Sequence, residues 1–252
     1  MAQQRVVLIT GGAKGVGRGI TEAFLAAGDR VIVCGRSAPE QPLERDGNRA
    51  GFISADVRDM EAVDAMMRQF EQDYGRLDVL VNNAGGSPEA MADKASPRFH
   101  RAIVELNLLA PLHLAQHANR LMQPQDGGGV IVFVGSVSAT RPSPGTAAYG
   151  AAKAGIVSLT QSLAVEWGPQ VRVVCVSPGM VETEQSTLHY GDQAGIQRVA
   201  DTVPLRRLAQ PREIGDACLW MSDARSAYVS GSNLVVHGGG ERPAFLDAAA
   251  RG

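Results

Sequence analysis

The chain has 252 residues, of which 44% are hydrophobic and 20% are charged, and its formal net charge is −2. This balance excludes a disordered chain, and the length suits one large α/β domain, so we expect a single domain over residues 1–252. Lysine and arginine are scattered along the chain, which argues against a nucleic-acid-binding protein and against a protein that binds an anionic membrane surface. The sequence lacks both a signal region and a membrane-spanning apolar run, so we expect a cytoplasmic protein whose partners are small molecules and other subunits.

Short runs rich in β-branched residues alternate with longer stretches in which apolar residues recur at helical spacing. The expected strands are Val6–Thr10, Val31–Cys34, Phe52–Ser54, Val79–Val81, Val130–Val134, Val171–Val176 and Leu234–Val236. The expected helices are Val16–Ala27, Met60–Tyr74, Phe99–Leu121, Ala151–Trp167 and Pro211–Met221. Apolar strands joined by helices predict a parallel sheet covered on both faces, which is a Rossmann-type, doubly wound fold of about seven strands. Residues 241–252 are expected to form a C-terminal tail.

A glycine-rich turn joins the first expected strand to the first expected helix. It reads Thr10-Gly11-Gly12-Ala13-Lys14-Gly15-Val16-Gly17. Such a turn lets the backbone approach a pyrophosphate, whose charge is favoured by the free amides and the dipole at the start of the helix. The alternative is a tight turn whose glycines serve packing alone, but the strand before it and the helix after it favour a dinucleotide site.

The second expected strand ends in Cys34-Gly35-Arg36-Ser37, without the acidic residue that binds the ribose 2′-hydroxyl of NAD. Arg36 could instead pair with a 2′-phosphate, and Lys14 could reach the same phosphate from the glycine turn. These two residues favour NADP(H) over NAD(H) as the cofactor. The alternative for each is an ordinary charge on the surface.

A hydroxyl group and a tyrosine–lysine pair follow in the second half of the chain. Ser136 comes after the fifth expected strand, at the carboxyl edge of the sheet, where open α/β folds bind ligands. Tyr149 and Lys153 are four residues apart at the start of a long helix and therefore share one face. A nearby ammonium stabilises a phenolate, so the pair could act in proton transfer, although a pair at this spacing is also common on helix surfaces.

We expect no metal site. His113 and His117 have the spacing of a zinc pair, but Leu114 stands where a metalloprotease needs its glutamate, and no third ligand is evident. The cysteines each lie in an apolar stretch without metal-binding spacing, and they are Cys34, Cys175 and Cys218.

In this order, the motifs resemble the short-chain dehydrogenase/reductase family over about residues 5–240, and in particular its NADP(H)-dependent members that are similar to 3-oxoacyl reductases. The residues that carry the resemblance are the glycine turn, Asn82-Asn83-Ala84-Gly85, Ser136, Tyr149 with Lys153, and Ser177-Pro178-Gly179. One departure is His237 before the terminal glycines, where the family usually has an acidic residue.

The resemblance implies a catalytic tetrad. Ser136 would hold the substrate oxygen, and Tyr149 would be the general acid or base. Lys153 would bind the nicotinamide ribose and lower the pKa of Tyr149, and Asn107 would join a water-linked proton relay. The resemblance also implies a mobile substrate lid over residues 182–204 and a homotetramer, with a dimer as the fallback.

The resemblance further implies an extended set of cofactor contacts. They are Gly11, Lys14, Gly15, Val16, Gly17, Arg36, Asp56, Val57, Asn83, Ala84, Gly85, Tyr149, Lys153, Pro178, Gly179, Val181 and Thr183. Residues lining the substrate pocket would include Gly86, Ser138, Arg141 and Met180.

The function that these observations favour is an NADP(H)-dependent oxidoreductase that interconverts a ketone and a secondary alcohol. One alternative is a 3-oxoacyl thioester reductase, which uses the same tetrad. An alternative of another class is a catalytically silent NADP(H)-binding sensor or scaffold, because this fold can bind nucleotides without chemistry.

Overall fold

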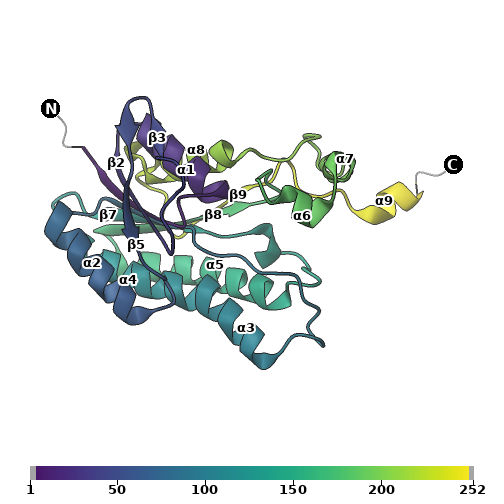
Figure 1. Ribbon diagram of the computed structural model, residues 1–252, viewed down its shortest axis with the longest axis horizontal. Helices are drawn as coiled ribbons and strands as arrows, with labels where there is room; N and C mark the ends of the chain where they lie inside the picture. Colours follow the sequence, from purple (N-terminus) through teal and green to yellow (C-terminus); the bar gives the residue numbers. More distant parts are fainter. Residues whose placement is uncertain (1–3, 250–252) are drawn as a thin grey trace.

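The computed structural model describes residues 4–249 and contains a seven-stranded sheet (Figure 1). Its strands are β1 (Val6–Thr10), β2 (Arg30–Gly35), β5 (Gly51–Ser54), β6 (Val79–Asn82), β7 (Gly129–Val134), β8 (Val171–Pro178) and β9 (Asn233–Val236). Their order in the sheet is β5-β2-β1-β6-β7-β8-β9, and each neighbouring pair is parallel. The expected doubly wound fold is therefore confirmed, with its switch of direction between β1 and β6. A short antiparallel hairpin of β3 (Glu44–Arg45) and β4 (Asn48–Arg49) is an addition that the sequence did not predict.

The helices cover both faces of this sheet (Figure 1). They are α1 (Gly15–Ala26), α2 (Met60–Tyr74), α3 (Pro97–Val104), α4 (Ala110–Met122), α5 (Ala147–Trp167), α6 (Ser186–Tyr190), α7 (Gln193–Ala200), α8 (Pro211–Ser222) and α9 (Ala244–Ala249). Alternate residues of the central strands point to opposite faces, so Leu8 packs with α2, α4 and α5 whereas Val7 and Ile9 pack with α1 and α8. Between residues 4 and 249, no helix is both long enough and apolar enough to cross a membrane.

The expected single helix Phe99–Leu121 is wrong in detail, because a π-helical turn, Glu105–Leu109, separates α3 from α4. Pro111 explains this interruption. In a continuous α-helix its ring would collide with the carbonyl of Asn107, four residues earlier, and it has no N–H to donate to that carbonyl. The amide of Ala110 reaches back five residues to the carbonyl of Glu105 instead. The extra residue in this turn carries Asn107 into the fold, where its side chain is buried.

The carboxyl ends of the strands lie at one edge of the sheet, which is the right-hand side of Figure 1. The glycine turn before α1, the start of α5 and the short helices α6, α7 and α9 are all on this side (Figure 1). Parallel strands leave their connecting turns at this edge, and ligands of open α/β sheets bind there. The topology therefore brings together motifs that are up to 170 residues apart, from the turn around Gly11 to the segment around Val181.

Candidate functional site

Several positions of the glycine turn cannot accommodate a side chain. Gly11 and Gly15 have positive φ angles of 64° and 51°. A Cβ on Gly17 would lie 2.1 Å from the carbonyl oxygen of Gly11. The turn therefore depends on glycine for two separate reasons, which are the left-handed conformation and the close approach of α1 to the strand before it.

The start of α1 can receive an anion. Lys14 is the N-cap residue, its side chain makes no capping hydrogen bond, and the first turn contains no acidic residue. The backbone amides of this turn therefore have no side-chain acceptor from the cap, and the helix dipole adds to their attraction for negative charge. Thr183 lies on the other side of the turn, since its Cγ2 is 3.6 Å from the position of a Cβ on Gly15. These groups fit the pyrophosphate of a dinucleotide.

The segment after β6 is fastened to the end of β1. The hydroxyl of Thr10 accepts hydrogen bonds from the amides of Asn83 and Ala84, each at 2.9 Å. The side-chain Nδ2 of Asn83 donates to the carbonyl of Thr10 at 2.9 Å. The side-chain amide of Asn83 therefore joins the segment after β6 to the end of β1, in addition to the expected place of this residue among the cofactor contacts. Sequence reasoning assigned no role to Thr10, although a hydroxyl at the end of a buried strand was a usable indication.

Charged groups gather where the adenosine end of a dinucleotide would lie. Asp56 forms an ion pair with Arg58, at 2.6 Å between Oδ2 and Nη2. The hydrogen bonds from Arg58, together with the nearby charge of Arg36, hold the pKa of Asp56 below its usual value. Arg36 is exposed after β2, and Val57 is buried beside Asp56.

A groove of about 580 Å³ adjoins these residues. Its lining residues are Asp56, Arg58, Asp59, Arg98, Arg101, Ala102 and Glu105. The sequence did not single out Arg58, which reaches Asp56 because only one residue separates them. Three of the seven lining residues are arginines and three are carboxylates, and Arg58 is paired with Asp56, so the charges along the groove balance.

Lys153 is buried in the middle of the predicted catalytic residues, with 4% of its surface exposed. Its Nζ donates a hydrogen bond to the carbonyl of Val134 at 2.7 Å. Burial lowers the pKa of Lys153 to about 8, because the charged form is poorly solvated there, and the nearby Cys175 opposes this effect. The Nζ atom lies 5.6 Å from the centroid of the Tyr149 ring. The expected pairing of Tyr149 and Lys153 on one helix face is thus present.

Tyr149 and Ser136 lie together at the carboxyl edge of β7. Burial raises the pKa of Tyr149 above its usual value, and a hydrogen bond with Ser136 lowers it in part. The backbone of Ser136 is extended, and its Oγ accepts a hydrogen bond from the amide of Ser138 at 3.1 Å. The side chain of Ser136 is therefore held at the point where β7 ends, and the phenol of Tyr149 lies within hydrogen-bonding distance of it.

Asn107 reaches the same region from the π-helical turn. Its Oδ1 accepts from the amide of Gly86 at 2.8 Å, and its Nδ2 donates to the carbonyl of Gly86 at 3.0 Å. A Cβ on Gly85 would lie 2.7 Å from Oδ1 of Asn107 and 3.5 Å from Nζ of Lys153. Gly85 therefore lies between the two side chains, and the four residues of the predicted tetrad meet at one place. The π-helical turn that positions Asn107 was not predicted.

The segment after β8 also lies at the carboxyl edge of the sheet. The amide of Gly179 donates to the carbonyl of Val236 at 2.9 Å, and Val181 forms an isolated bridge with Ala209. β8 ends at Pro178. The chain then continues through Gly179 and Val181 along the same edge of the sheet as the predicted catalytic residues. His237, the departure from the family pattern, packs against Gly179, where a Cβ would lie 2.7 Å from the Cβ of His237.

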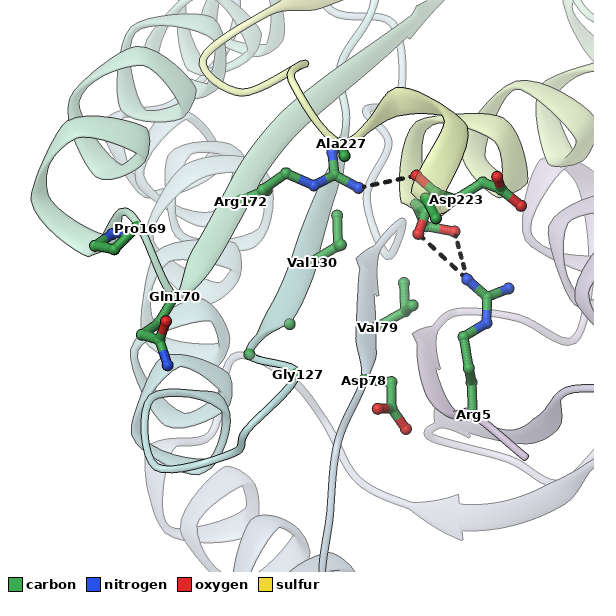
Figure 2. Close-up of a pocket in the computed structure, with 14 residues that line it drawn as sticks. Arg5, Asp78, Val79, Gly127, Val130, Pro169, Gln170, Arg172, Asp223 and Ala227 are labelled. Carbon is green, nitrogen blue, oxygen red and sulfur yellow. Dashed lines mark hydrogen bonds between the residues drawn. The ribbon is translucent and has the colours of Figure 1, made fainter. Parts of the chain in front are cut away.

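A cavity of about 300 Å³ lies at the opposite, amino edge of the sheet (Figure 2). Arg5 and Arg172 lie on it, and none of the predicted site residues does. Arg172 donates to the carbonyls of Met221 and Val229 at 3.1 and 2.7 Å, which fixes the end of α8. Its donors thus serve the structure, and the cavity lies away from the predicted chemistry.

The two histidines at zinc-like spacing do not assemble a ligand set. His117 Nε2 lies 2.9 Å from a carboxylate oxygen of Asp64. Among residues 4–249, no group of three or more histidine, cysteine, aspartate or glutamate side chains could hold a metal ion.

Comparison with known proteins extends these observations. Residues 11–241 match the family model described as enoyl-(acyl carrier protein) reductase. The chain is 36% identical over 243 residues to an uncharacterized short-chain type dehydrogenase/reductase, y4vI, of Sinorhizobium fredii, and the match covers 93% of this chain and 43% of that longer protein. It is 31% identical to the 3-oxoacyl-(acyl-carrier-protein) reductase FabG of Chlamydia muridarum, over 93% of this chain and 96% of that one.

Two further relatives are named for other substrates. The chain is 32% identical to a 3alpha-hydroxysteroid dehydrogenase of Mediterraneibacter gnavus, over 94% of this chain and 97% of that one. The ligand-free structure of aldohexose dehydrogenase from Thermoplasma acidophilum superposes with a TM-score of 0.87 at 27% identity, over 94% of each chain. The chain belongs to the short-chain dehydrogenase/reductase family, whose members are oxidoreductases that bind a nicotinamide cofactor and act on CH–OH or C=O groups of small molecules.

Proposed function

We propose that this chain interconverts a ketone and a secondary alcohol with NADP(H), and that Tyr149 is the general acid or base. The observation that carries the proposal is the group formed by Ser136, Tyr149 and the buried Lys153 at the carboxyl edge of the sheet. A tyrosine hydrogen-bonded to a serine, with an ammonium 5.6 Å from its ring, can deliver a proton to an oxygen that the serine also contacts.

The proposed cofactor contacts run along this edge. The glycine turn from Gly11 to Gly17 and Thr183 would hold the pyrophosphate, because the amides at the start of α1 are open to an anion. The segment Asn83-Ala84-Gly85 and Asp56-Val57 would border the adenosine, and Lys153 would bind the nicotinamide ribose. Pro178, Gly179 and Val181 would border the nicotinamide, which supplies or accepts the hydride when it is bound.

We propose NADP(H) over NAD(H) on the charges at the end of β2. Gly35-Arg36-Ser37 offers no carboxylate to a ribose 2′-hydroxyl, and Arg36 is exposed at this position. Lys14 is exposed at the cap of α1. Two exposed cations at the edge of the adenosine region would favour a 2′-phosphate.

In the reduction direction, Ser136 would donate a hydrogen bond to the substrate oxygen while that oxygen gains negative charge. Tyr149 would then protonate the oxygen. Its raised pKa suits this role, because the phenol keeps its proton at neutral pH until the substrate accepts it. Oxidation requires the phenolate, and we propose that the ammonium of Lys153 stabilises it in the complex with cofactor and substrate.

We propose that Asn107 both positions the segment after β6 and takes part in a proton relay toward Lys153. The hydrogen bonds to Gly86 occupy its Nδ2 and one lone pair of its Oδ1. A carbonyl oxygen has a second lone pair, which leaves one acceptor for a water of the relay.

A homotetramer is the proposed assembly, with a dimer as the alternative. Large apolar side chains are exposed on two separate surfaces. Val165 on α5 is 84% exposed and lies on one surface, whereas Trp220 of α8 and Val235 of β9 are 42% and 39% exposed on the other. Two apolar surfaces support two kinds of contact between copies. Sedimentation equilibrium should give four times the mass of the chain, and a monomer would contradict the proposal.

The experiment that tests the proposed reaction is the consumption of NADPH with a panel of ketones, diketones, sugars, steroids and acyl thioesters, followed by the reverse reaction with NADP⁺. We expect turnover of at least one ketone. Reduction of acetoacetyl thioesters well above that of simple ketones would favour the 3-oxoacyl reductase alternative, which the similarity to the FabG reductase supports. Enoyl thioesters belong in the panel because of the description of the matching family model. Cofactor binding without any turnover would favour a silent sensor or scaffold.

A further inference from the structure

Arg141 lies on the loop that follows Ser136, and this loop is tied back to the site. The hydroxyl of Ser143 is 3.2 Å from that of Ser138 and 2.6 Å from that of Thr146. The amide of Gly150, next to Tyr149, donates to the carbonyl of Thr146 at 2.9 Å. The backbone that carries Arg141 is thus fixed relative to the two residues proposed to contact the substrate oxygen.

The guanidinium of Arg141 joins this loop to the chain beyond β9. Its Nη2 lies 2.9 Å from Oε1 of Glu241, and its Nη1 donates to the carbonyl of Pro142 at 3.2 Å. Glu241 comes five residues after the end of β9. The segment before Glu241 contacts the end of the expected lid, since a Cβ on Gly239 would lie 2.9 Å from the Cβ of Pro204.

Tyr190 belongs to the expected lid and lies near the ion pair. It ends α6 and, like Met180, packs against the small cluster of Ile196, Ala200 and Leu208. Burial raises the pKa of Tyr190, Arg141 lowers it and Glu241 raises it, so the phenol lies within electrostatic reach of both charges. The Arg141–Glu241 ion pair therefore lies near a phenol of the expected lid, and Arg141 stands on the loop that leads from Ser136 to Tyr149.

The ion pair is open to exchange. The side chains of Arg141 and Glu241 are 38% and 39% exposed. A pair with this exposure is weakly stabilising, because water screens the charges and both side chains lose conformational freedom. A carboxylate that arrives on a bound substrate would replace Glu241 at little cost, and the planar guanidinium can bind it through two parallel hydrogen bonds.

We propose that Arg141 is a specificity-determining residue that binds a carboxylate of the substrate in place of Glu241, so that the substrate class is a carbonyl compound with a carboxylate at a fixed distance. This inference rests on the proposed carbonyl–alcohol function and adds the chemistry of the group remote from the reacting carbon.

The test compares oxo acids with their methyl esters, in a series in which two to five bonds separate the carbonyl from the carboxyl group. The ratio of kcat/KM for acid to that for ester is measured with the native protein and with Arg141→Gln, Glu241→Gln and Arg68→Gln. Arg68 is an exposed arginine on α2, outside the proposed site and the expected lid, for which the structure shows no ion pair with a described residue, which makes it a matched control.

We expect the native protein to prefer the acid at one spacing, by tenfold or more and through KM. Arg141→Gln should abolish this preference, Glu241→Gln should increase it, and Arg68→Gln should leave the ratio as it is in the native protein. Reduction of the esters without any preference for an acid would overturn the inference while leaving the proposed function intact. An equal fall in kcat/KM for acid and ester in Arg141→Gln would show that the residue only supports the loop. That result would also overturn the inference.

If no member of the series is turned over, the proposed function fails for these carbonyls. The role of Arg141 is then tested by measuring the binding of the oxo acids. Calorimetric titration of the oxo acids into the protein with NADPH would then show binding that Arg141→Gln weakens at least tenfold. Absence of binding to the native protein, or equal binding to both, would overturn the inference.

Discussion

Asn107 and Gly86 exchange two hydrogen bonds, one in each direction, between the π-helical turn and the segment after β6. The same Nδ2 also donates to the carbonyl of Ile103 at 2.9 Å. The side chain of Asn107 is fully buried, so these bonds have no competition from water. They fix the backbone of the segment that borders both the proposed cofactor site and Lys153.

We predict that Asn107→Ala lowers both stability and turnover. The variant leaves the N–H and C=O of Gly86 without their partners, which should cost about 1–3 kcal/mol of unfolding free energy. Displacement of the segment should reduce kcat by up to about 100-fold, because small misplacements of reacting groups are expensive. Chemical denaturation and steady-state kinetics check this, with Asn119→Ala on α4 as the control. Equal behaviour of the two variants would show that the Gly86 pair has no special role.

The glycine turn gives a prediction about packing. A Cβ at position 17 would overlap the carbonyl oxygen of Gly11, so Gly17→Ala should destabilise the protein by about 1–3 kcal/mol and weaken cofactor binding. Gly127 has open space around the position of its Cβ, which makes Gly127→Ala a matched control with little effect. Thermal unfolding with and without NADPH measures both consequences. An unchanged Gly17→Ala protein would mean that α1 can move away from β1.

The buried ammonium of Lys153 makes stability depend on pH. Its pKa is lowered from 10.5 to about 8 in the folded chain, so the unfolded chain binds more protons between these values. The native protein should therefore gain stability relative to Lys153→Met as the pH rises from about 8 toward 10.5, by up to about 3 kcal/mol. Below pH 8 both states are protonated and the difference should be constant. Urea denaturation of both proteins from pH 7 to 10 tests this, and a flat difference throughout would contradict a buried, charged Lys153.

Cofactor preference should depend on Arg36. We predict that Arg36→Asp loses its preference for NADP(H), because the new carboxylate repels the 2′-phosphate and can accept a hydrogen bond from a 2′-hydroxyl. The ratio of kcat/KM for NADPH to that for NADH should fall by about 10- to 100-fold, equivalent to the loss of a charge-assisted pair. Arg68→Asp, an exposed arginine on α2, is the control. Equal use of both cofactors by the native protein would refute the assignment of NADP(H).

Much of this architecture followed from the sequence, since strands such as Val6–Thr10 and helices such as Met60–Tyr74 have the expected bounds. β-branched runs and helical periodicity are strong local patterns, and the order of motifs determined which residues reach the carboxyl edge. The π-helical turn at Asn107 was not predicted, because apolar periodicity continues through it. Pro111 was the only local indication that the α-helical hydrogen bonds are interrupted.

Contacts between distant segments could not be predicted from the sequence either. Glu241 reaches Arg141 across 100 residues. The expected lowering of the pKa of Tyr149 by Lys153 is wrong for the chain without cofactor, because burial raises this pKa and the hydrogen bond with Ser136 opposes the rise only in part. Spacing in the sequence indicates which side chains share a face, whereas solvation depends on everything that packs around them.

The proposal that Tyr149 transfers the proton is tested most directly by Tyr149→Phe. This variant keeps the ring and removes only the hydroxyl, so it should fold and bind NADPH, as measured by thermal unfolding and cofactor fluorescence. Its kcat should fall by about 100- to 10,000-fold, which is the usual contribution of a general acid. Tyr228→Phe, at a fully exposed tyrosine, controls for the substitution itself. A stable Tyr149→Phe protein with near-normal turnover would contradict the mechanism.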